Sequence, residues 1–525
     1  MQYLIGVDLG TQGTKAALQD ETGKLVKESF EPSRLIYPEP GAVEQDPRDM
    51  LESVLRCIRD VVVNSGIAPG DVAAVGIDGQ MAGVMGVDAD GMAATPYDSW
   101  LDTRCGSQRG QFLAYGEEAV IELTGTPVTY AHGPKILWWK NERPDIYRNI
   151  RRFVQPAAYC VMRMCGLSGS DAFIDHTYLH FTGFADTANR KWSAELLSEL
   201  GVDAEKMPRI VKPYDKMGGL TPEMAGACGL LAGTPMVAGC GDTAASSFGA
   251  GIIREGLLFD VAGTASVLAC AAADFRPDVK HKTILYAPSV IDGLYTPMAY
   301  IGGGGLCLKW FRDSVLQKSH NYSQLDEIAA KIMPGSEDLL FVPHFSGRTC
   351  PNDVKVRGSF INISWQHGPA HFYRAIMEGI AYEYGIYKDI IKELNPELDY
   401  EQLISVGGGA KSRLFGQIKA DALGIPVSTI RLSDTAASGC CAIAGYGVGL
   451  YDSLTASVER RALLNETVEP RPDNTALYGR LQKIYAELFP ALNGVYSNLQ
   501  QLLPGRKGLF ASQLEIHGEV RKDFP

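Results

Sequence analysis

The chain has 525 residues, of which 46% are hydrophobic, and a formal net charge of −12. This length is too great for one ordinary core and predicts two domains. The acidic balance excludes a nucleic-acid-binding surface, which needs clustered Lys and Arg, and favours small-molecule substrates. No apolar run reaches the 18–20 residues or so of a membrane span, and no signal-type segment opens the chain, so a cytoplasmic protein is expected.

The first predicted elements are three short strands joined by tight turns. They are expected at Tyr3–Asp8, Lys15–Asp20 and Leu25–Phe30, because the connections are too short for crossover helices. The turn GTQGTK leaves backbone N–H groups uncovered, so it is either a phosphate site or a plain hairpin turn. Asp8 ends the first strand, where a carboxylate beside a phosphate needs a cation such as Mg²⁺. The candidate phosphate-binding residues are Gly10, Thr11, Gln12, Gly13, Thr14 and Lys15.

A helix and a buried strand come next. Asp46 and Pro47 predict the start of a helix that runs to about Asn64. The strand Val72–Asp78 then ends in a glycine turn. Polar groups at strand ends beside one aromatic face suit recognition of a polyhydroxylated ligand, although Trp100 alone would more often be a core residue. The candidate contacts for such a ligand are Gln80, Met81, Trp100, Asp102 and Arg104.

The stretch VAGCGDTAASSFGAG places Asp242 on a glycine-flanked turn between a buried strand and a run of small, helix-favouring residues. A carboxylate in this position has two interpretations. It can cap the helix, which is the commoner role of such an Asp. It can also act as a general base that takes a proton from a substrate hydroxyl.

The second half of the chain repeats the pattern of the first. GLLFDVAGTASVL again reads strand, aspartate, Gly-Thr turn and strand, with Asp260 before Gly263-Thr264. Leu403–Val406 is a buried strand that ends in Gly407-Gly408-Gly409. Alternating strands and helices indicate an α/β fold, and the repetition predicts two related domains with a cleft between them. The predicted divisions are residues 1–250, 251–450 and a helical extension over 451–525, with helices at Leu477–Leu488 and Leu492–Leu502 and a tail at Gly518–Pro525.

Other motifs are missing or uninformative. No P-loop and no dinucleotide-binding glycine motif is present, which disfavours those folds. His176 and His180, like His367 and His371, are four residues apart, but neither pair has the glutamate of a zinc-peptidase motif. A helix or loop surface is therefore expected for these histidines rather than a metal site.

In combination, the motifs resemble those of the FGGY carbohydrate kinases, and within that family those of the xylulokinases. The resemblance covers about residues 1–450. It is carried by the opening GVDLGTQGTK, GIDGQMAG (76–83), WLDTRC (100–105), GCGDTAASSFGAG (239–251), VAGTASVL (261–268), FSGRTCPND (345–353), the stretch from Gly358 to Gly379 that ends in RAIMEG, and VGGGAKS (406–412).

The resemblance implies two actin-like, ribonuclease-H-like ATPase domains with ATP and sugar in the interdomain cleft. It implies Asp242 as the catalytic base, Asp8 and Asp242 as the residues near Mg²⁺, and Thr243 beside the sugar. Besides the first turn, the residues implied at the nucleotide are Gly263, Thr264, Ala265, Ser266, Gly303, Gly304, Gly407, Gly408, Gly409 and Ala410.

Two departures bear on which sugar is bound. Xylulokinases usually have Met-His where this chain has Met81-Ala82, and Asn where it has Thr243. The resemblance thus implies ATP-dependent phosphorylation of the primary hydroxyl of a ketopentose such as D-xylulose. A kinase for another ketose or polyol (ribulose, a hexulose, erythritol or a glycerol-like compound) is the alternative. A non-catalytic actin-fold nucleotide-binding protein is a second one, and a homodimer is kept open as the assembly.

Overall fold

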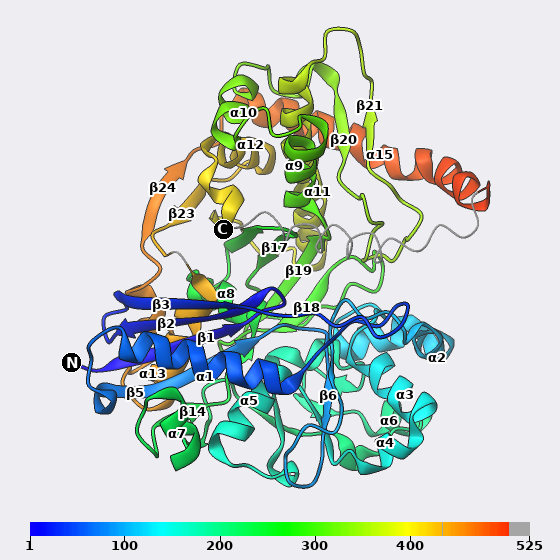
Figure 1. Cartoon of the computed structure of the whole chain (residues 1–525). Coiled ribbons are helices and arrows are strands. Elements are labelled where there is room, and N and C mark those ends of the chain that lie inside the picture. The colour runs from blue at the N-terminus through cyan, green and yellow to red at the C-terminus, as the bar shows by residue number, and fades with distance from the viewer. Residues whose placement is uncertain (433, 503–525) are drawn as a thin grey trace.

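The computed structural model describes residues 1–432 and 434–502, and two seven-stranded sheets with their helices form most of it (Figure 1). The predicted tail Gly518–Pro525 lies outside the described residues. Among the helices of the described ranges, none combines the length and the apolarity that crossing a membrane requires.

The first sheet contains the three strands expected at the N-terminus. β1 pairs antiparallel with β2 and parallel with β5, and β2 pairs antiparallel with β3, which confirms the predicted β-meander. In this register Asp8 lies opposite Lys15 on one side and Asp78 on the other. The strand order is β13 (Lys216–Gly219), β14 (Pro235–Val237), β5 (Val72–Gly79), β1 (Tyr3–Leu9), β2 (Gly13–Asp20) and β3 (Leu25–Pro32), with β15 (Cys240–Gly241) also on β5.

Helices cover both faces of this sheet because the buried side chains of β1 alternate between them. Ile5, Val7 and Leu9 pack against α1 (Pro47–Val63) and α5 (Pro156–Cys165), while Leu4 packs against α8 (Asp242–Gly249) and α13 (Thr435–Gly447). As predicted, Asp46 caps α1, accepting a hydrogen bond from the Arg48 N–H at 2.8 Å. The even-numbered face of β1, which carries Asp8, is therefore the face that meets α8 and α13.

The second sheet repeats the arrangement with the second Gly-Thr hairpin. β16 pairs antiparallel with β17 and parallel with β22. Its strand order is β18 (Leu285–Pro288), β19 (Tyr295–Ile301), β17 (Ser266–Cys270), β16 (Leu257–Ala262), β22 (Gln402–Val406), β23 (Val427–Ile430) and β24 (Leu464–Val468). One face is covered by α9 (Gly304–Trp310), α10 (Tyr322–Ala329), α11 (Pro369–Leu394), α12 (Arg413–Leu423) and α15 (Pro472–Leu502).

The chain passes between the two sheets at three places. After α8 it enters β16, after β23 it returns to the first sheet as α13, and after α14 (Leu454–Glu459) it re-enters the second sheet as β24. In Figure 1, α13, coloured orange, consequently lies beside the blue N-terminal strands, although the two are far apart in sequence. The domain divisions at residues 250 and 450 remain predictions, and packing of α13 on the first sheet joins the two regions closely.

The predicted pair of helices at Leu477–Leu488 and Leu492–Leu502 is wrong. A single helix, α15, spans Pro472–Leu502 and contains Pro490. Proline in a helix removes one backbone hydrogen bond and favours a kink or a break. Here Tyr485 and Tyr496 are buried on either side of it, so packing holds both halves in one helix.

Smaller elements form a lobe beside the first sheet, around a separate cluster that includes Phe112, Trp138 and Phe153. The elements of this part of the chain are β4 (Glu44–Gln45), β6 (Met85–Val87), β7 (Tyr97–Asp98), α2 (Gly106–Thr124), α3 (His132–Glu142), α4 (Pro144–Asn149), β8 (Arg152–Val154), β9 (Phe173–Asp175), η3 (His176–Phe181), β10 (Ala185–Asp186), β11 (Lys191–Trp192), α6 (Ala194–Glu199), β12 (Arg209–Val211) and α7 (Pro222–Cys228).

Candidate active site

A cavity of about 590 Å³ lies between the two sheets. From the first sheet and its helices it is lined by Asp8, Ser246 and Thr435, and from the second by the Gly407–Ala410 turn. This volume lies in the usual range of small-molecule sites. The structure thus brings Asp8 to the same cavity as the turn predicted to contact the adenosine.

Four carboxylates gather around the end of β1, and only one of them was expected beside Asp8. Burial raises the pKa of Asp8 to about 7, and the neighbouring carboxylates of Asp434 and Asp242 add to the effect. Asp78, level with Asp8 on β5, is fully buried, and this burial raises its pKa well above the usual value. The ammonium of Lys15 offsets part of this negative charge through an ion pair with Asp434 at 2.8 Å.

The turn that carries Asp242 is held by the helix η3. The N–H of Gly241 donates to the Thr177 hydroxyl at 3.0 Å, and the Tyr178 hydroxyl donates to the carbonyl oxygen of Cys240 at 3.2 Å. Asp242 begins α8, and its own carboxylate accepts hydrogen bonds from the N–H and hydroxyl of Thr243. Burial raises its pKa to about 6, which suits a base that must take a proton near neutral pH.

Asp434 was missed in the sequence, although a signal for it was present. The pentapeptide DTAAS occurs twice, at 242–246 and at 434–438. The two copies begin α8 and α13, which pack side by side, and the hydroxyls of Ser246 and Thr435 lie 2.6 Å apart. The Asp434 carboxylate caps α13 by accepting from the Ala437 N–H at 3.0 Å. An internal repeat of this kind predicts equivalent positions in two related halves.

Each Gly-Thr turn is closed by a backbone hydrogen bond from its first glycine, across four residues in the first turn and three in the second. The Gly10 N–H donates to the Gly13 carbonyl at 3.0 Å, and the Gly263 N–H donates to the Ala265 carbonyl at 3.1 Å. The Gln12 side chain is exposed, whereas the Thr14 hydroxyl lies 2.6 Å from that of Ser53 on α1 and is fully buried. The Thr14 hydroxyl therefore anchors the first turn to α1 and points away from the cavity.

The Gly303–Gly305 segment packs tightly against the second turn. A Cβ atom added at Gly304 would lie 2.2 Å from the Ser266 hydroxyl oxygen, and one at Gly305 would lie 1.9 Å from the Gly263 carbonyl oxygen. Only glycine permits this approach. The structure accordingly brings together the two glycine segments predicted at the nucleotide. The third begins at Gly407, with φ 85°, directly after the neighbouring strand β22.

The sugar candidates divide into two groups, of which the first is linked to the N-terminal turn. The Trp100 indole N–H donates to the Thr11 hydroxyl at 2.8 Å, and that hydroxyl donates to the Gln80 side-chain oxygen at 3.1 Å. The Gln80 amide in turn donates to Gln45 at 2.6 Å. Met81 lies against Gly241, where an added Cβ would be 2.6 Å from its methyl carbon, so it is next to the Asp242 turn.

The second group, Asp102 and Arg104, makes its contacts within the protein. The Arg104 guanidinium pairs with Glu44, Asp98 and Asp102 at 2.5–3.0 Å and lies 4.3 Å from the centre of the Trp138 ring. The Asp102 carboxylate, which is fully buried, also accepts from the Val43 N–H at 2.9 Å. These two side chains fix the loop that carries Trp100.

Comparison with known protein families agrees with the two-sheet fold and its glycine turns. The N-terminal domain of the FGGY family of carbohydrate kinases matches residues 3–249, and the C-terminal domain of that family matches residues 260–448. The chain belongs to the FGGY family of carbohydrate kinases. This FGGY kinase is an ATP-dependent sugar phosphotransferase, as the motifs predicted, and the alternative of a non-catalytic nucleotide-binding protein is disfavoured.

Individual relatives support the same family and differ in their substrates. A xylulose kinase of Bacillus subtilis is 28% identical, with 93% of this chain and 97% of that protein covered. A gluconokinase of the same organism is 25% identical, with 95% and 97% covered. A xylulose kinase structure from Brucella ovis, 28% identical, superposes with a TM-score of 0.85 over 94% of this chain and all of that one. The predicted actin-like, two-domain α/β fold is confirmed.

Asp8 lines the cavity and Asp242 lies near it, and this pair fits a magnesium ion, although within residues 1–432 and 434–502 no three ligating side chains are placed to hold one metal ion together. Mg²⁺ is usually held by one or two carboxylates, with phosphate oxygens and water completing its shell. Asp8 and Asp242 would supply that number of hard oxygen ligands. A divalent cation would also relieve their mutual repulsion, which adds to the effect of burial in raising the pKa of Asp8.

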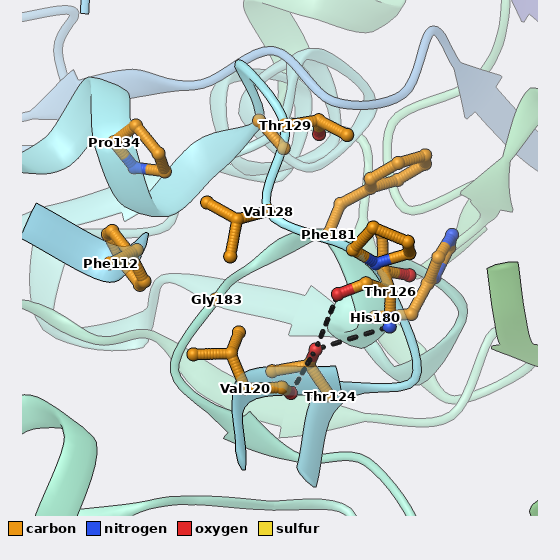
Figure 2. Close-up of a pocket in the computed structure, with 12 residues that line it drawn as sticks. Phe112, Val120, Thr124, Thr126, Val128, Thr129, Pro134, His180, Phe181 and Gly183 are labelled. Carbon is orange, nitrogen blue, oxygen red and sulfur yellow. Dashed lines mark hydrogen bonds between the residues drawn. The ribbon is translucent and has the colours of Figure 1, made fainter. Parts of the chain in front are cut away.

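The histidine prediction is wrong for one pair. His176 and His180 lie in η3 and are buried, and burial lowers the pKa of His180 to about 3, so it is neutral. Figure 2 shows His180 beside Thr126 and Phe181 at a cavity of about 20 Å³. That volume holds about one water molecule and cannot hold a sugar. The larger cavity at Asp8 therefore remains the candidate active site.

Proposed function

We propose that this FGGY kinase phosphorylates the primary hydroxyl of a ketopentose such as D-xylulose, with Asp242 as the general base. The observation that carries the proposal is the position of Asp242. Its carboxylate lies close enough to Asp8 at the nucleotide cavity to raise the pKa of that residue, and its turn packs against Met81. It is thus the carboxylate that can reach both a sugar hydroxyl and a terminal phosphate.

In the proposed reaction, Asp242 accepts the hydroxyl proton while the sugar oxygen bonds to the γ-phosphorus of ATP. The bond from that phosphorus to the bridging oxygen breaks, and ADP leaves. Thr243 holds the Asp242 carboxylate by two hydrogen bonds. Mg²⁺ at Asp8 and Asp242 would neutralise charge on the phosphate oxygens. The remaining contribution is alignment of the two substrates between the sheets.

The ketopentose assignment rests on similarity to xylulose kinases, while similarity to a gluconokinase and two local departures favour other substrates. Ala82 offers only a methyl group where the related enzymes usually have an imidazole, and it adopts a left-handed conformation, with φ 58°. Other ketoses and polyols, namely ribulose, a hexulose, erythritol or glycerol, are therefore the alternative substrates.

A panel of sugars tests the substrate directly. ADP release is measured with D-xylulose, D-ribulose, D-fructose, erythritol, glycerol and gluconate at equal concentration. The proposal expects the highest kcat/KM with a ketopentose. A preference of more than about tenfold for gluconate or a polyol would overturn the ketopentose assignment and leave the kinase assignment intact.

The role of Asp242 is tested by Asp242→Asn, with Asp145→Asn on the exposed surface of α4 as the matched control. The amide keeps the shape and removes the base. We expect kcat to fall by about two to four orders of magnitude, the usual reach of general base catalysis, with ATP affinity nearly unchanged. Turnover of Asp242→Asn close to that of the control would remove Asp242 from this role.

A further inference from the structure

A second cavity, of about 430 Å³, lies where the chain passes between the two sheets. One wall is the turn between β2 and β3, with Lys24. The others are the connection from β23 towards α13, with Arg431, and the connection from α14 to β24, with Arg460 and Arg461. We call this the hinge cavity, because two of the three connections between the sheets line it.

The hinge cavity has an excess of positive charge. The side chains of Lys24, Arg431 and Arg460 are exposed, and within residues 1–432 and 434–502 they form no salt bridge and no side-chain hydrogen bond. The Lys24 ammonium does lie close enough to the Asp20 carboxylate to interact with it electrostatically. Arg461 is buried and donates to the Tyr451 hydroxyl at 2.6 Å and to Gln19 at 3.2 Å, with no carboxylate partner in those ranges. Four cations thus line one concavity of a chain whose net charge is −12, and this local concentration of positive charge favours an anionic ligand.

Two carboxylates also line the cavity and do not cancel this charge. Asp434 is already paired with Lys15 at 2.8 Å. Glu28, on the exposed face of β3, is then the one acidic side chain left among the described lining residues to offset four cations. The balance favours a ligand with two or more negative charges.

We propose that the hinge cavity binds a phosphorylated small molecule or inorganic pyrophosphate, at a site separate from the nucleotide cavity. Guanidinium groups match phosphate oxygens in pairs, which favours phosphate over a monocarboxylate. The volume lies within the range of small-molecule sites. The hinge cavity adjoins the nucleotide cavity at Leu432 and Asp434, but its cations come from a different set of residues.

The position of the hinge cavity gives the bound anion a mechanical effect. Lys24 belongs to the first sheet, whereas Arg431 and Arg460 belong to the two connections that must bend when the sheets move relative to each other. An anion that contacts all three ties the first sheet to the hinge. Occupancy therefore restrains the angle between the sheets, whichever sugar the enzyme phosphorylates.

Binding is tested on the full chain saturated with ADP, so that the nucleotide cavity is filled. Inorganic pyrophosphate and ribose 5-phosphate are titrated separately by calorimetry, and hydrogen exchange maps the contact. We expect one site, whose affinity falls with ionic strength, and slower exchange at residues 20–28 and 457–465. Pyrophosphate binding alone would identify an inorganic anion as the ligand, and ribose 5-phosphate binding a phosphorylated metabolite.

Variants decide which cavity is occupied. Arg431→Gln and Arg460→Gln should each weaken binding about tenfold, the usual effect of one lost charge-assisted hydrogen bond. Arg413→Gln is the matched control, since Arg413 lines the nucleotide cavity and is exposed. Absence of binding, equal binding by all three variants, or a loss confined to Arg413→Gln with protection at residues 405–412 would each overturn the proposal. None of these outcomes bears on the sugar kinase reaction.

Discussion

The two Gly-Thr hairpins share a turn, a strand pairing and an aspartate, but they use the aspartate in opposite ways. In β1–β2 the spacing is Asp8-x-Gly10-Thr11, and in β16–β17 it is Asp260-x-x-Gly263-Thr264. Side chains alternate between the faces of a strand, so one extra residue turns the carboxylate to the other face. Asp8 faces the cavity between the sheets, and Asp260 faces the core under α11 and α12.

Their partners differ accordingly. Asp8 is surrounded by other carboxylates, with Lys15 as the nearby cation. Asp260 forms a fully buried ion pair with Lys419 and accepts hydrogen bonds from the hydroxyls of Ser405 and Tyr384, both at 2.6 Å. A repeated motif thus predicts the same hairpin pairing of the backbone in both halves. The role of a side chain in it depends on which face of the strand the side chain occupies.

The largest expected effect is on stability, at the second hairpin. Asp260→Asn leaves the buried ammonium of Lys419 without its counter-charge, so the free energy of unfolding should fall by roughly 3–5 kcal/mol. Replacing both partners, Asp260→Leu with Lys419→Met, should recover much of this loss, because no buried charge remains. Urea denaturation measures both. An Asp260→Asn variant as stable as the wild type would contradict the structural role.

The first hairpin should respond in the opposite manner. Asp8→Asn removes a proposed magnesium ligand, so we expect kcat/KM to fall about a hundredfold or more. Stability should be equal or higher, because a carboxylate crowded by Asp434 and Asp242 is removed. Coupled ADP assays and urea denaturation on the same sample separate the two effects. Wild-type turnover in Asp8→Asn would contradict the proposed role of Asp8 as a magnesium ligand.

A smaller effect should appear in the pH dependence of stability. The pKa of Asp8 is raised to about 7 in the folded protein, while an unfolded Asp titrates near 4. Between these values the folded state binds more protons, so Asp8 makes the protein less stable as the pH rises from about 4 to about 7. Its contribution is at most about 1.4 kcal/mol per pH unit.

Thermal or urea unfolding of wild type and Asp8→Asn across this range is the measurement, without nucleotide or metal. The stability gained by Asp8→Asn should grow with pH and level off above about pH 7. A gain that stays constant with pH, or one that shrinks, would show that the Asp8 carboxyl titrates normally.

The smallest effect concerns the two threonines of the turns. The Thr11 hydroxyl is occupied by Trp100 and Gln80, whereas Thr264 is exposed, and its hydroxyl bonds to no other described residue. Thr11→Val should therefore raise KM for the sugar several-fold, and Thr264→Val should raise KM for ATP several-fold. Steady-state kinetics with each substrate varied in turn distinguish these results from the reverse pattern, which would contradict the different roles of the turns.

Much of the site could be predicted from short stretches of sequence. The glycines at 10, 263 and 407 mark turns that the structure confirms, and Asp242 follows a strand and begins a helix as expected. What was missed involves contacts between distant segments. Asp434 reaches the carboxylates at the end of β1 only because α13 returns to the first sheet, and the repeated DTAAS was the one local hint of it.

The sequence by itself determined the hairpins, the cap of α1, the glycine turns and the family, because each depends on residues close together in the chain. Tertiary structure alone decided that Asp8 lies among carboxylates and Asp260 beside Lys419, that Arg104 is held by three carboxylates, and that four cations meet at the hinge cavity. The physical reason is that the energy of a charge depends on the charges and solvent around it in space. Those neighbours are brought together by the packing of segments hundreds of residues apart.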